Sequence, residues 1–343
     1  VPDEYGSIQS AIDAASEGDS VLVFDGIYYE NIEIDEELTV IGNGTANTTI
    51  NGTFTDNTIK ITADKVSLSH LNIEAGGNST LDYCGILVYH SDSITISEVL
   101  VNKGRQGICI SGGEHNKISY SLIKDNSGQG VILNANNEYT TVENTTIKSN
   151  DFAAIHADQS GDYSIIHNNT IIDNDNGISI DRASSITISY NTINGNNGNG
   201  LDSNTAGLWF MDGSQHNIRY NNISNNRNGI HTWYIGGEGP NDLTLIGNII
   251  NDNEDDGIVI GRDSTNWSLW NNTIKGNGDY DIHFSSTGST GHRSVNTDFD
   301  AIYVNSGSSL TIREYFVLDV NDASGDNMSG IDIKVMENDV QKY

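Results

Sequence analysis

The sequence predicts an all-β solenoid, in which short strands wind into stacked coils, followed by a short β-hairpin or partial β-sandwich. Two observations predict the solenoid. A four-residue phrase of the type Gly-Ile-x-Ile recurs between Cys84 and His283, at intervals of 22 to 30 residues. Asparagines recur at fixed offsets from that phrase. Self-similarity at such a period is typical of stacked supersecondary units rather than of one central core.

The recurring phrase marks nine consecutive coils. Their first residues are Gly85, Gly107, Gly130, Ala154, Gly177, Gly207, Gly229, Gly257 and Asp281. Because strand side chains alternate between faces, the isoleucines are expected inside and the variable residue outside. The two longest intervals, 177–207 and 229–257, predict inserted loops. Such insertions in repeat proteins often border a binding face.

The N-terminal segment predicts a helix that caps the solenoid. Residues 7–15 place Ile8, Ala11, Ile12 and Ala15 on one helical face, with Ser7 as N-cap. Short apolar or alternating segments follow at 21–24, 26–34 and 38–42. A terminal helix would cover the open end of the first coil.

This opening, SIQSAIDAASEGDSVLVFDGIYYENIEI followed by LTVIGNG, resembles the N-terminal cap of right-handed parallel β-helix proteins. The resemblance is to the pectate-lyase-like superfamily and to NosD-like carbohydrate-binding and sugar-hydrolase surface proteins. It implies a right-handed parallel β-helix over residues 1–295. The superfamily includes lyases, hydrolases, esterases, epimerases and adhesins, so the resemblance implies a fold more firmly than an activity.

After His283 the repeat fades. Residues 286–309 are rich in Ser, Thr, Gly and Asn, and residues 310–335 read as strand, turn, strand. This end resembles the first hairpin of an immunoglobulin-like sandwich, although it is too short for a complete one. We therefore predict that residues 296–343 are a linker plus the start of such a sandwich or a C-terminal cap.

Two asparagine columns are predicted to be structural. In the first, each Asn follows a strand isoleucine by three residues: Asn126, Asn150, Asn174, Asn196, Asn226, Asn253 and Asn277. In the second, each Asn precedes such an isoleucine by two residues: Asn169, Asn191, Asn221, Asn248 and Asn272. Parallel coils lie about 4.8 Å apart, so stacked amides can donate to one neighbour and accept from the other.

The charge is strongly acidic, with 47 Asp and Glu against 16 Lys and Arg and a formal net charge of −31. Such a surface repels phosphate backbones, which argues against nucleic acid as a partner. The two cysteines, Cys84 and Cys109, lie one residue before and two residues after their repeat glycines. Strict alternation would point them to opposite faces, so two free thiols are favoured over a disulfide unless the register shifts.

Location is predicted to be extracellular or at the cell surface. The sequence contains no signal peptide and no apolar segment long enough to cross a bilayer. Ten Asn-x-Ser/Thr sequons favour an exported glycoprotein, although several arise from the repeat itself. They lie at Asn43, Asn47, Asn51, Asn78, Asn144, Asn168, Asn222, Asn266, Asn271 and Asn327.

Candidate site residues emerge when the outward positions are aligned across coils. The middle coils gather polar and aromatic side chains there, whereas the outer coils carry mostly small or aliphatic ones. The catalytic candidates are Asp158, Asp181, Arg182 and His231. The carbohydrate-binding candidates are His156, Trp209, Asp212, Trp233, Tyr234 and Arg262.

The chemistry of these residue types fits a sugar polymer. Paired carboxylates on adjacent coils, Asp158 and Asp181, suit acid and base catalysis at a glycosidic bond. Aromatic rings can stack on sugars, and Arg or His can neutralise a developing negative charge. The alternative is that Asp158 and Asp181 simply pair with Arg182 while the aromatic side chains pack beneath the inserted loops.

Metal sites are weakly indicated. His156 and His231 are three coils apart, about 14 Å, which is too far for one zinc or copper ion. Oxygen-rich segments at 173–175, 253–256 and 298–300 suit Ca²⁺, but none forms a complete calcium-binding loop. No metal ligand is assigned, and calcium is the one candidate cofactor. The polygalacturonase motifs are absent apart from Asn296-Thr-Asp298, as are those of pectate lyases, so no catalytic residue is transferred from those families.

Two functions compete. The first is a polysaccharide-binding β-helix that uses the face at residues 156–262. Cleavage of the bound polymer, as a lyase or glycoside hydrolase, is a separate hypothesis. The second is a structural or adhesive module of a cell-surface layer, sheath or filament, which would self-assemble and have no catalytic activity. The unfinished C-terminal segment and the missing motifs favour the second, and the outward cluster of aromatic and charged residues favours the first.

Overall fold

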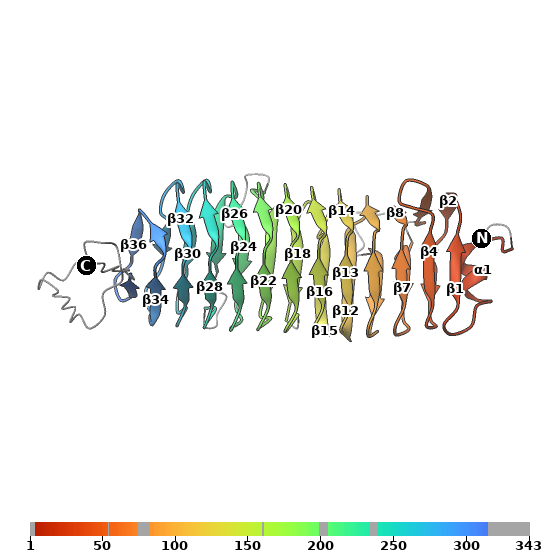
Figure 1. The fold of residues 1–343 in the computed structure, drawn as a ribbon, viewed down its shortest axis with the longest axis horizontal. Coiled ribbons are helices and arrows are strands. Elements are labelled where there is room, and N and C mark those ends of the chain that lie inside the picture. The colour runs from red at the N-terminus through yellow and green to blue at the C-terminus, as the bar shows by residue number, and fades with distance from the viewer. Residues whose placement is uncertain are drawn as a thin grey trace, which may run out of the picture. The chain divides into compact units, whose positions relative to one another are not determined.

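The computed structural model describes residues 4–53, 55–74, 83–159, 161–198, 205–233 and 239–314. Within this part the chain forms a parallel β-helix, as predicted, in which each coil contributes one strand to each of three sheets. Figure 1 shows the coils side by side, with strands of one sheet running in the same direction.

The first sheet has thirteen strands, each paired in parallel with the strand three elements later. They are β1 (Ser20–Val23), β4 (Thr39–Gly42), β7 (Ser67–Ser69), β10 (Thr95–Ser97), β13 (Lys117–Ser119), β16 (Thr141–Glu143), β19 (Ile165–His167), β22 (Thr187–Ser189), β25 (Asn217–Arg219), β28 (Thr244–Ile246), β31 (Ser268–Trp270), β34 (His292–Val295) and β37 (Leu310–Arg313).

The second sheet has twelve strands. They are β2 (Gly26–Tyr29), β5 (Thr48–Asn51), β8 (Asn72–Glu74), β11 (Leu100–Asn102), β14 (Leu122–Lys124), β17 (Thr146–Lys148), β20 (Thr170–Ile172), β23 (Thr192–Asn194), β26 (Asn222–Ser224), β29 (Ile249–Asn251), β32 (Thr273–Lys275) and β35 (Asp298–Phe299).

The third sheet, which carries the recurring phrase, also has twelve strands. They are β3 (Ile32–Ile34), β6 (Ile59–Ile61), β9 (Cys84–Tyr89), β12 (Gln106–Glu114), β15 (Val131–Glu138), β18 (Ala153–Asp158), β21 (Asn176–Asp181), β24 (Ala206–Phe210), β27 (Asn228–Thr232), β30 (Ile258–Ile260), β33 (Ile282–Phe284) and β36 (Ile302–Val304).

The core is one continuous column of apolar side chains between the three sheets. Ile108 and Ile110 of β12, the two isoleucines of one repeat, are fully buried, as predicted for the inward positions. Full burial of such a side chain contributes about 1.5–3 kcal/mol. Phe210, Trp267 and Phe284 are the largest fully buried side chains.

The asparagine ladders form as predicted. In the first column, Nδ2 of Asn126 donates to Oδ1 of Asn150 at 2.9 Å, and the chain of amides continues through Asn253 to Asn277. In the second, Asn191 donates to Asn221 at 2.9 Å, and Asn221 donates to Asn248 at 3.0 Å. Each amide therefore satisfies buried backbone groups of neighbouring coils as well as the next amide.

The capping helix is present but shorter than predicted. Helix α1 spans Ile8–Ile12, with Ser7 as N-cap and Ile8, Ala11 and Ile12 buried. The Glu30 carboxylate accepts hydrogen bonds from the backbone N–H groups of Ile8 and Gln9, at 2.9 and 3.1 Å. These bonds satisfy two of the amides that every helix N-terminus leaves unpaired, which fixes α1 to the first coil.

The strands continue past residue 295, where the sequence analysis placed the end of the array. β35, β36 and β37 extend all three sheets, and residues 1–313 form one compact unit. The predicted hairpin begins at Leu310, but Leu310–Arg313 form β37, which pairs in parallel with β34 in the first sheet. The rest of the predicted hairpin, from residue 315, lies outside the described residues. Parts of the two predicted insertions, 199–204 and 234–238, also lie outside them.

Candidate functional site

The outward column of the third sheet is arranged as the sequence predicted. His156 pairs in register with Ser179, Ser179 with Trp209, and Trp209 with His231. The column continues through Val259 to His283. Asp158 and Asp181 are likewise direct neighbours on β18 and β21. The alternation of strand side chains therefore brings these residues to one face.

The position just before each repeat glycine also faces outward, which strict alternation does not predict. A Cβ built on Gly107 would lie 2.8 Å from Ile123 Cγ2 and 3.1 Å from Asn126 Nδ2, both interior atoms. The glycine and the following Ile108 therefore both face inward at the corner of the coil. Residues on either side of this inward pair, such as Gln106 and Cys109, both lie outside.

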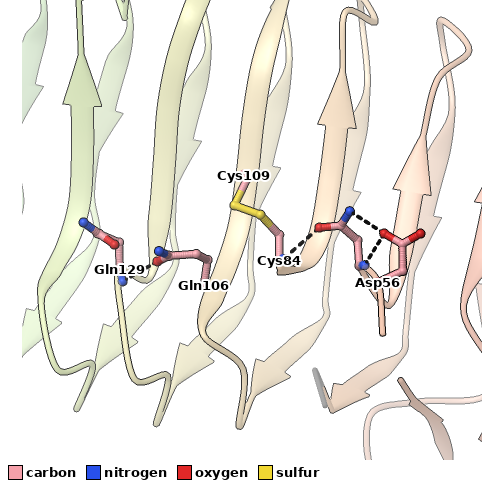
Figure 2. The surroundings of a disulfide bond; sticks show 6 residues. Asp56, Cys84, Gln106, Cys109 and Gln129 are labelled. Atoms are coloured by element: carbon pink, nitrogen blue, oxygen red, sulfur yellow. Dashed lines mark hydrogen bonds between the residues drawn. A yellow bond between two sulfur atoms is a disulfide. The ribbon is translucent and has the colours of Figure 1, made fainter. Parts of the chain in front are cut away.

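This second outward column forms its own hydrogen-bond ladder. Gln106 Oε1 accepts the backbone N–H of Gln129 at 2.7 Å, and Asp256 Oδ1 accepts that of Tyr280 at 3.0 Å (Figure 2 shows the first). A side-chain oxygen at the position before the repeat glycine therefore has a structural role, because it accepts a backbone N–H of the next coil. A contact between such a side chain and another side chain adds to this structural role.

The prediction of two free thiols is wrong. Cys84 and Cys109 form a disulfide between β9 and β12, with their Cα atoms 6.0 Å apart (Figure 2). Cys84 pairs in register with Gln106, three residues before Cys109. Because the inward glycine interrupts the alternation between them, both cysteines lie on the outer face, within reach of each other.

A groove of about 460 Å³ lies on the same face towards the C-terminal coils, and we name it the His283 groove. Its lining residues are Asn228, His231, Thr232, Trp233, Asp255, Asp256, Val259, Gly261, Arg262, Asp279, His283, Ser285 and Ser286. Three of the predicted site residues, His231, Trp233 and Arg262, meet here. A concave site with an aromatic wall and a few polar groups is typical of a ligand-binding site.

An Asp–His pair lies at the wall of the groove. His283 Nδ1 is 2.8 Å from Oδ2 of Asp256, and the Asp256 side chain is only 10% exposed. The imidazole packs against the rings of Tyr280 and Tyr303, with centroid distances of 5.2 and 5.4 Å. A carboxylate on Nδ1 selects the tautomer that carries its proton there, so Nε2 is a proton acceptor.

His283 was not among the candidates predicted from the sequence, and Asp256 was considered there only as part of the oxygen-rich segment 253–256. The available signal was the position of Asp256 directly before Gly257. Recognising that this position faces outward would have placed Asp256 beside His283, one coil away.

Asp158, Asp181 and Arg182 are brought together as an ion-pair cluster. Arg182 contacts both carboxylate oxygens of Asp181, at 2.9 and 3.0 Å, and its Nη2 lies 3.7 Å from Asp158. These carboxylates, with Asp212, raise the pKa of Arg182 further, Asp181 contributing most. The geometry is the ion-paired alternative considered from the sequence, and it leaves Asp181 without an unengaged carboxylate oxygen for catalysis.

The remaining candidates differ in their surroundings. Nδ1 of His156 lies 3.3 Å from Oγ of Ser179, and burial lowers the pKa of His156 despite the opposing charges of Asp158 and Asp181. Trp209 is half-buried, and its indole Nε1 has no hydrogen-bond partner among the described residues. Trp233 is 42% exposed. Tyr234 lies outside the described residues.

A second groove of about 520 Å³ lies on the third sheet around the disulfide. Arg105 crosses its wall, with its guanidinium carbon 5.3 Å from the centre of the Phe152 ring. His156 and Asp158 border the same groove. A smaller hollow of about 160 Å³ is lined by Asp181, Arg182, Met211 and Asp212. The predicted face is therefore several separate hollows rather than one continuous site.

The sequons lie mostly on accessible turns. Asn43, Asn47, Asn168, Asn222, Asn266 and Asn271 are exposed, and Asn51 and Asn144 are half-buried. Asn78 and Asn327 lie outside the described residues. Glycosylation at the exposed positions would meet no steric barrier from burial of the asparagine.

Calcium candidates are engaged in other contacts. Asn253 belongs to the asparagine ladder, Asp256 contacts His283, and both Asp298 and Asp300 pair with Lys275, at 2.8 and 3.5 Å. Across the described ranges, no group of three or more His, Cys, Asp or Glu side chains is placed to hold a metal ion. No helix in the same ranges is long and apolar enough to span a membrane.

Two family models match the chain. One, described as right handed beta helix region, covers residues 40–206, and the other, described as periplasmic copper-binding protein (NosD), covers residues 197–306. No curated protein matches the sequence. Both cysteines are in the disulfide, and Val259 separates His231 from His283. The described residues therefore do not fit a bound copper ion.

Solved structures share the fold at low sequence identity. The mannuronan C-5 epimerase AlgE6 A-module of Azotobacter vinelandii is 17% identical, with a TM-score of 0.75 over 91% of this chain and 95% of that one. An alginate lyase of Paenibacillus sp. is 14% identical, with a TM-score of 0.58 over 87% and 96%. The catalytic unit of an α-1,3-glucanase of Streptomyces thermodiastaticus is 14% identical, with a TM-score of 0.61 over 89% and 64%.

Proposed function

Because the chain belongs to the right-handed parallel β-helix superfamily, we propose that it is an exported protein that binds polysaccharide on the outer face of its third sheet. Export is supported by the Cys84–Cys109 disulfide, since such bonds persist mainly in oxidising compartments. The acidic surface supports the same location, because it suits an exposed, soluble molecule and disfavours nucleic acid.

One observation carries the proposal: the His283 groove gathers an exposed tryptophan, two histidines and several carboxylates and hydroxyls in one concave site on the third sheet. Sugars present apolar faces and many hydroxyl groups. Trp233 supplies the ring on which such a face stacks, and Ser285 and Asp279 supply hydrogen-bond partners for hydroxyls. The named activities of the structural neighbours, an epimerase, a lyase and a glucanase, all concern polysaccharides.

The hydrogen bond between Asp256 and His283 favours a second candidate function, acid–base cleavage of the bound polysaccharide. Nε2 of His283 is the proton acceptor, and Asp256 stabilises the imidazolium that proton transfer creates. The sequence-based catalytic candidates Asp158, Asp181, Arg182 and His231 stay predictions. Among them, His231 alone lines this groove.

The test is cosedimentation of the purified protein with a panel of insoluble polysaccharides, followed by reducing-end assays on soluble ones. We expect the protein to cosediment with at least one insoluble polysaccharide. A soluble form of that polysaccharide, added as competitor, is expected to keep the protein in the supernatant. Absence of binding to every polymer would contradict the proposal and favour the rival function, a structural or adhesive module that self-assembles. Filaments or sheets of the purified protein in electron micrographs would then support that rival.

A further inference from the structure

Resting on the proposed function, we infer that the polysaccharide bound in the His283 groove is uncharged and is not a polymer of uronic acids. The inference concerns the charge of the ligand. It follows from the fixed charges that line the groove and from the partners of the cationic side chains near it.

Carboxylates outnumber cationic side chains in the groove. Asp255, Asp256 and Asp279 line it, and Arg262 is the one Lys or Arg among its lining residues. The net charge of the whole chain, −31, has the same sign. A polymer that carries one carboxylate on each sugar would be repelled on approach and again within the groove.

The arginines beside the groove are already paired with carboxylates of the chain. Arg227 Nε lies 2.9 Å from Oδ2 of Asp255, and Arg262 Nε lies 3.1 Å from Oδ2 of Asp263. Farther along the face, Arg182 is held by Asp181. To bind a uronate, each guanidinium would have to exchange an internal carboxylate for an external one, which leaves the internal carboxylate unpaired.

The strands of the third sheet supply little additional positive charge. Lys60 on β6 is the one Lys or Arg within its twelve strands, and it pairs with Glu33 on β3 at 2.8 Å. β6 also lies far from the groove, because it is the second strand of this sheet and the groove is lined by residues of β27, β30 and β33. Recognition of successive carboxylates along a chain needs a row of available cationic donors. At this groove the described cationic donors are Arg227 and Arg262, and both are paired with carboxylates of the chain.

The same groups suit a neutral sugar. Trp233 is exposed for stacking, and carboxylates such as Asp279 accept hydrogen bonds from sugar hydroxyls without any requirement for opposite charge. Neutral sugars also have no carboxyl group to acidify a neighbouring carbon–hydrogen bond. Cleavage by β-elimination is therefore not available, and any cleavage at this groove consumes one water molecule per bond broken.

The experiment compares a polyuronate with the same polymer after chemical reduction of its carboxyl groups, alongside neutral glucans, by isothermal titration calorimetry at low and high salt. We expect binding to one or more uncharged polymers, with an affinity that changes less than about threefold with salt, because no ion pair forms. We expect at least tenfold weaker binding of the untreated polyuronate. The exposed Asp279→Asn variant is expected to narrow that gap, since it removes one repelling charge.

Binding of the untreated polyuronate in preference to its reduced form, with affinity falling as salt rises, would overturn the inference while leaving the proposed function intact. Failure of every polymer to bind would instead refute the proposed function, and the inference with it. In any cleaving preparation, new reducing ends without ultraviolet absorbance from an unsaturated product support the inference. Appearance of that absorbance contradicts it.

Discussion

His283 and Asp256 come from neighbouring coils, and their side chains share a hydrogen bond of 2.8 Å between Nδ1 and Oδ2. The second carboxylate oxygen of Asp256 accepts the backbone N–H of Tyr280. Asp256 thus has two roles: one oxygen holds the neighbouring coil through the Tyr280 N–H, and the other contacts His283 at the groove. A substitution that keeps the first contact and removes the charge separates the two roles.

Asp256→Asn separates them, because an amide oxygen still accepts the Tyr280 N–H but an amide cannot stabilise an imidazolium. If the protein cleaves its polysaccharide, we expect the initial rate of reducing-end formation to fall about 100-fold or more, with little change in thermal stability. Asp181→Asn is the comparison, and we expect a much smaller loss because Arg182 engages both oxygens of Asp181. A larger loss of rate in Asp181→Asn than in Asp256→Asn would instead indicate that the catalytic residues lie in the Arg182 cluster.

Asn221→Leu is expected to destabilise the β-helix strongly. Oδ1 of Asn221 accepts from the backbone N–H and Nδ2 of Asn191, and its own Nδ2 donates to the carbonyl of Ile188. Each buried group left unpaired costs about 1–3 kcal/mol, so we expect a total loss of about 3 kcal/mol or more. Asn222→Ala, at the exposed neighbouring position, is the matched control. Equal thermal midpoints for both variants would show that the ladder contributes little.

Removal of the disulfide is expected to lower stability without loss of the fold. Cys84 and Cys109 are 25 residues apart in sequence, and a closed loop of that size contributes about 3–4 kcal/mol by the chain-entropy estimate. The Cys84→Ser, Cys109→Ser double variant should therefore unfold at lower denaturant concentration than the wild type. Wild-type protein under reducing conditions should match the variant. Alkylation of both cysteines in unreduced, native protein would contradict the disulfide itself.

Mild acid is expected to destabilise the protein through two buried histidines. Burial lowers the pKa of His216 to about 3 and that of His292 to about 4. In the unfolded chain each has a pKa near 6.5, so below that pH the unfolded state binds protons that the folded state does not. The stability that comes from keeping these two histidines neutral is therefore fully present above about pH 6.5. As the pH falls, it is lost progressively, down to about pH 4 for His292 and about pH 3 for His216.

The matched variant is His216→Asn. His216 Nδ1 accepts the Ile186 N–H at 3.3 Å, and Asn116 Oδ1 accepts the Ile94 N–H at the equivalent position of another coil. Between pH 7 and pH 5, we expect the variant to lose about 2 kcal/mol less unfolding free energy than the wild type. The comparison removes the contribution of the many carboxylates, which both proteins share. Identical pH dependence of the two would show that His216 is not buried and neutral.

Much of the fold follows from the sequence, because the recurring phrase fixes the register of every coil. Once Ile108 and Ile110 are assigned to the interior, the pairing of His156 with Ser179 and of Trp209 with His231 follows by counting. The asparagine ladders follow in the same way, since equivalent residues of parallel coils must stack. The sequence does not reveal that the repeat glycine and the isoleucine after it both face the interior, which interrupts the inward–outward alternation of side chains along the strand.

The site was only partly predictable for that reason. His231, Trp233 and Arg262 were identified because they lie at regular outward offsets. Asp256 was considered only as a calcium candidate, and Cys84 was assigned to the wrong face, because both precede a repeat glycine. Side-chain pairing was also beyond the sequence: nothing in the residue order distinguishes a catalytic Asp181 from one held by Nε and Nη2 of Arg182.

The most direct test measures the affinity of two tryptophan variants for a polysaccharide that the wild type binds. One variant lacks a tryptophan on the third sheet, and the other lacks a tryptophan on the first sheet. Trp233→Ala removes the exposed ring at the His283 groove, and Trp270→Ala removes a half-buried ring from β31 of the first sheet. A central aromatic contact is worth about 2 kcal/mol or more, so we predict at least a 30-fold loss of affinity in Trp233→Ala and wild-type affinity in Trp270→Ala. Equal affinity of the two variants would contradict the placement of the binding site.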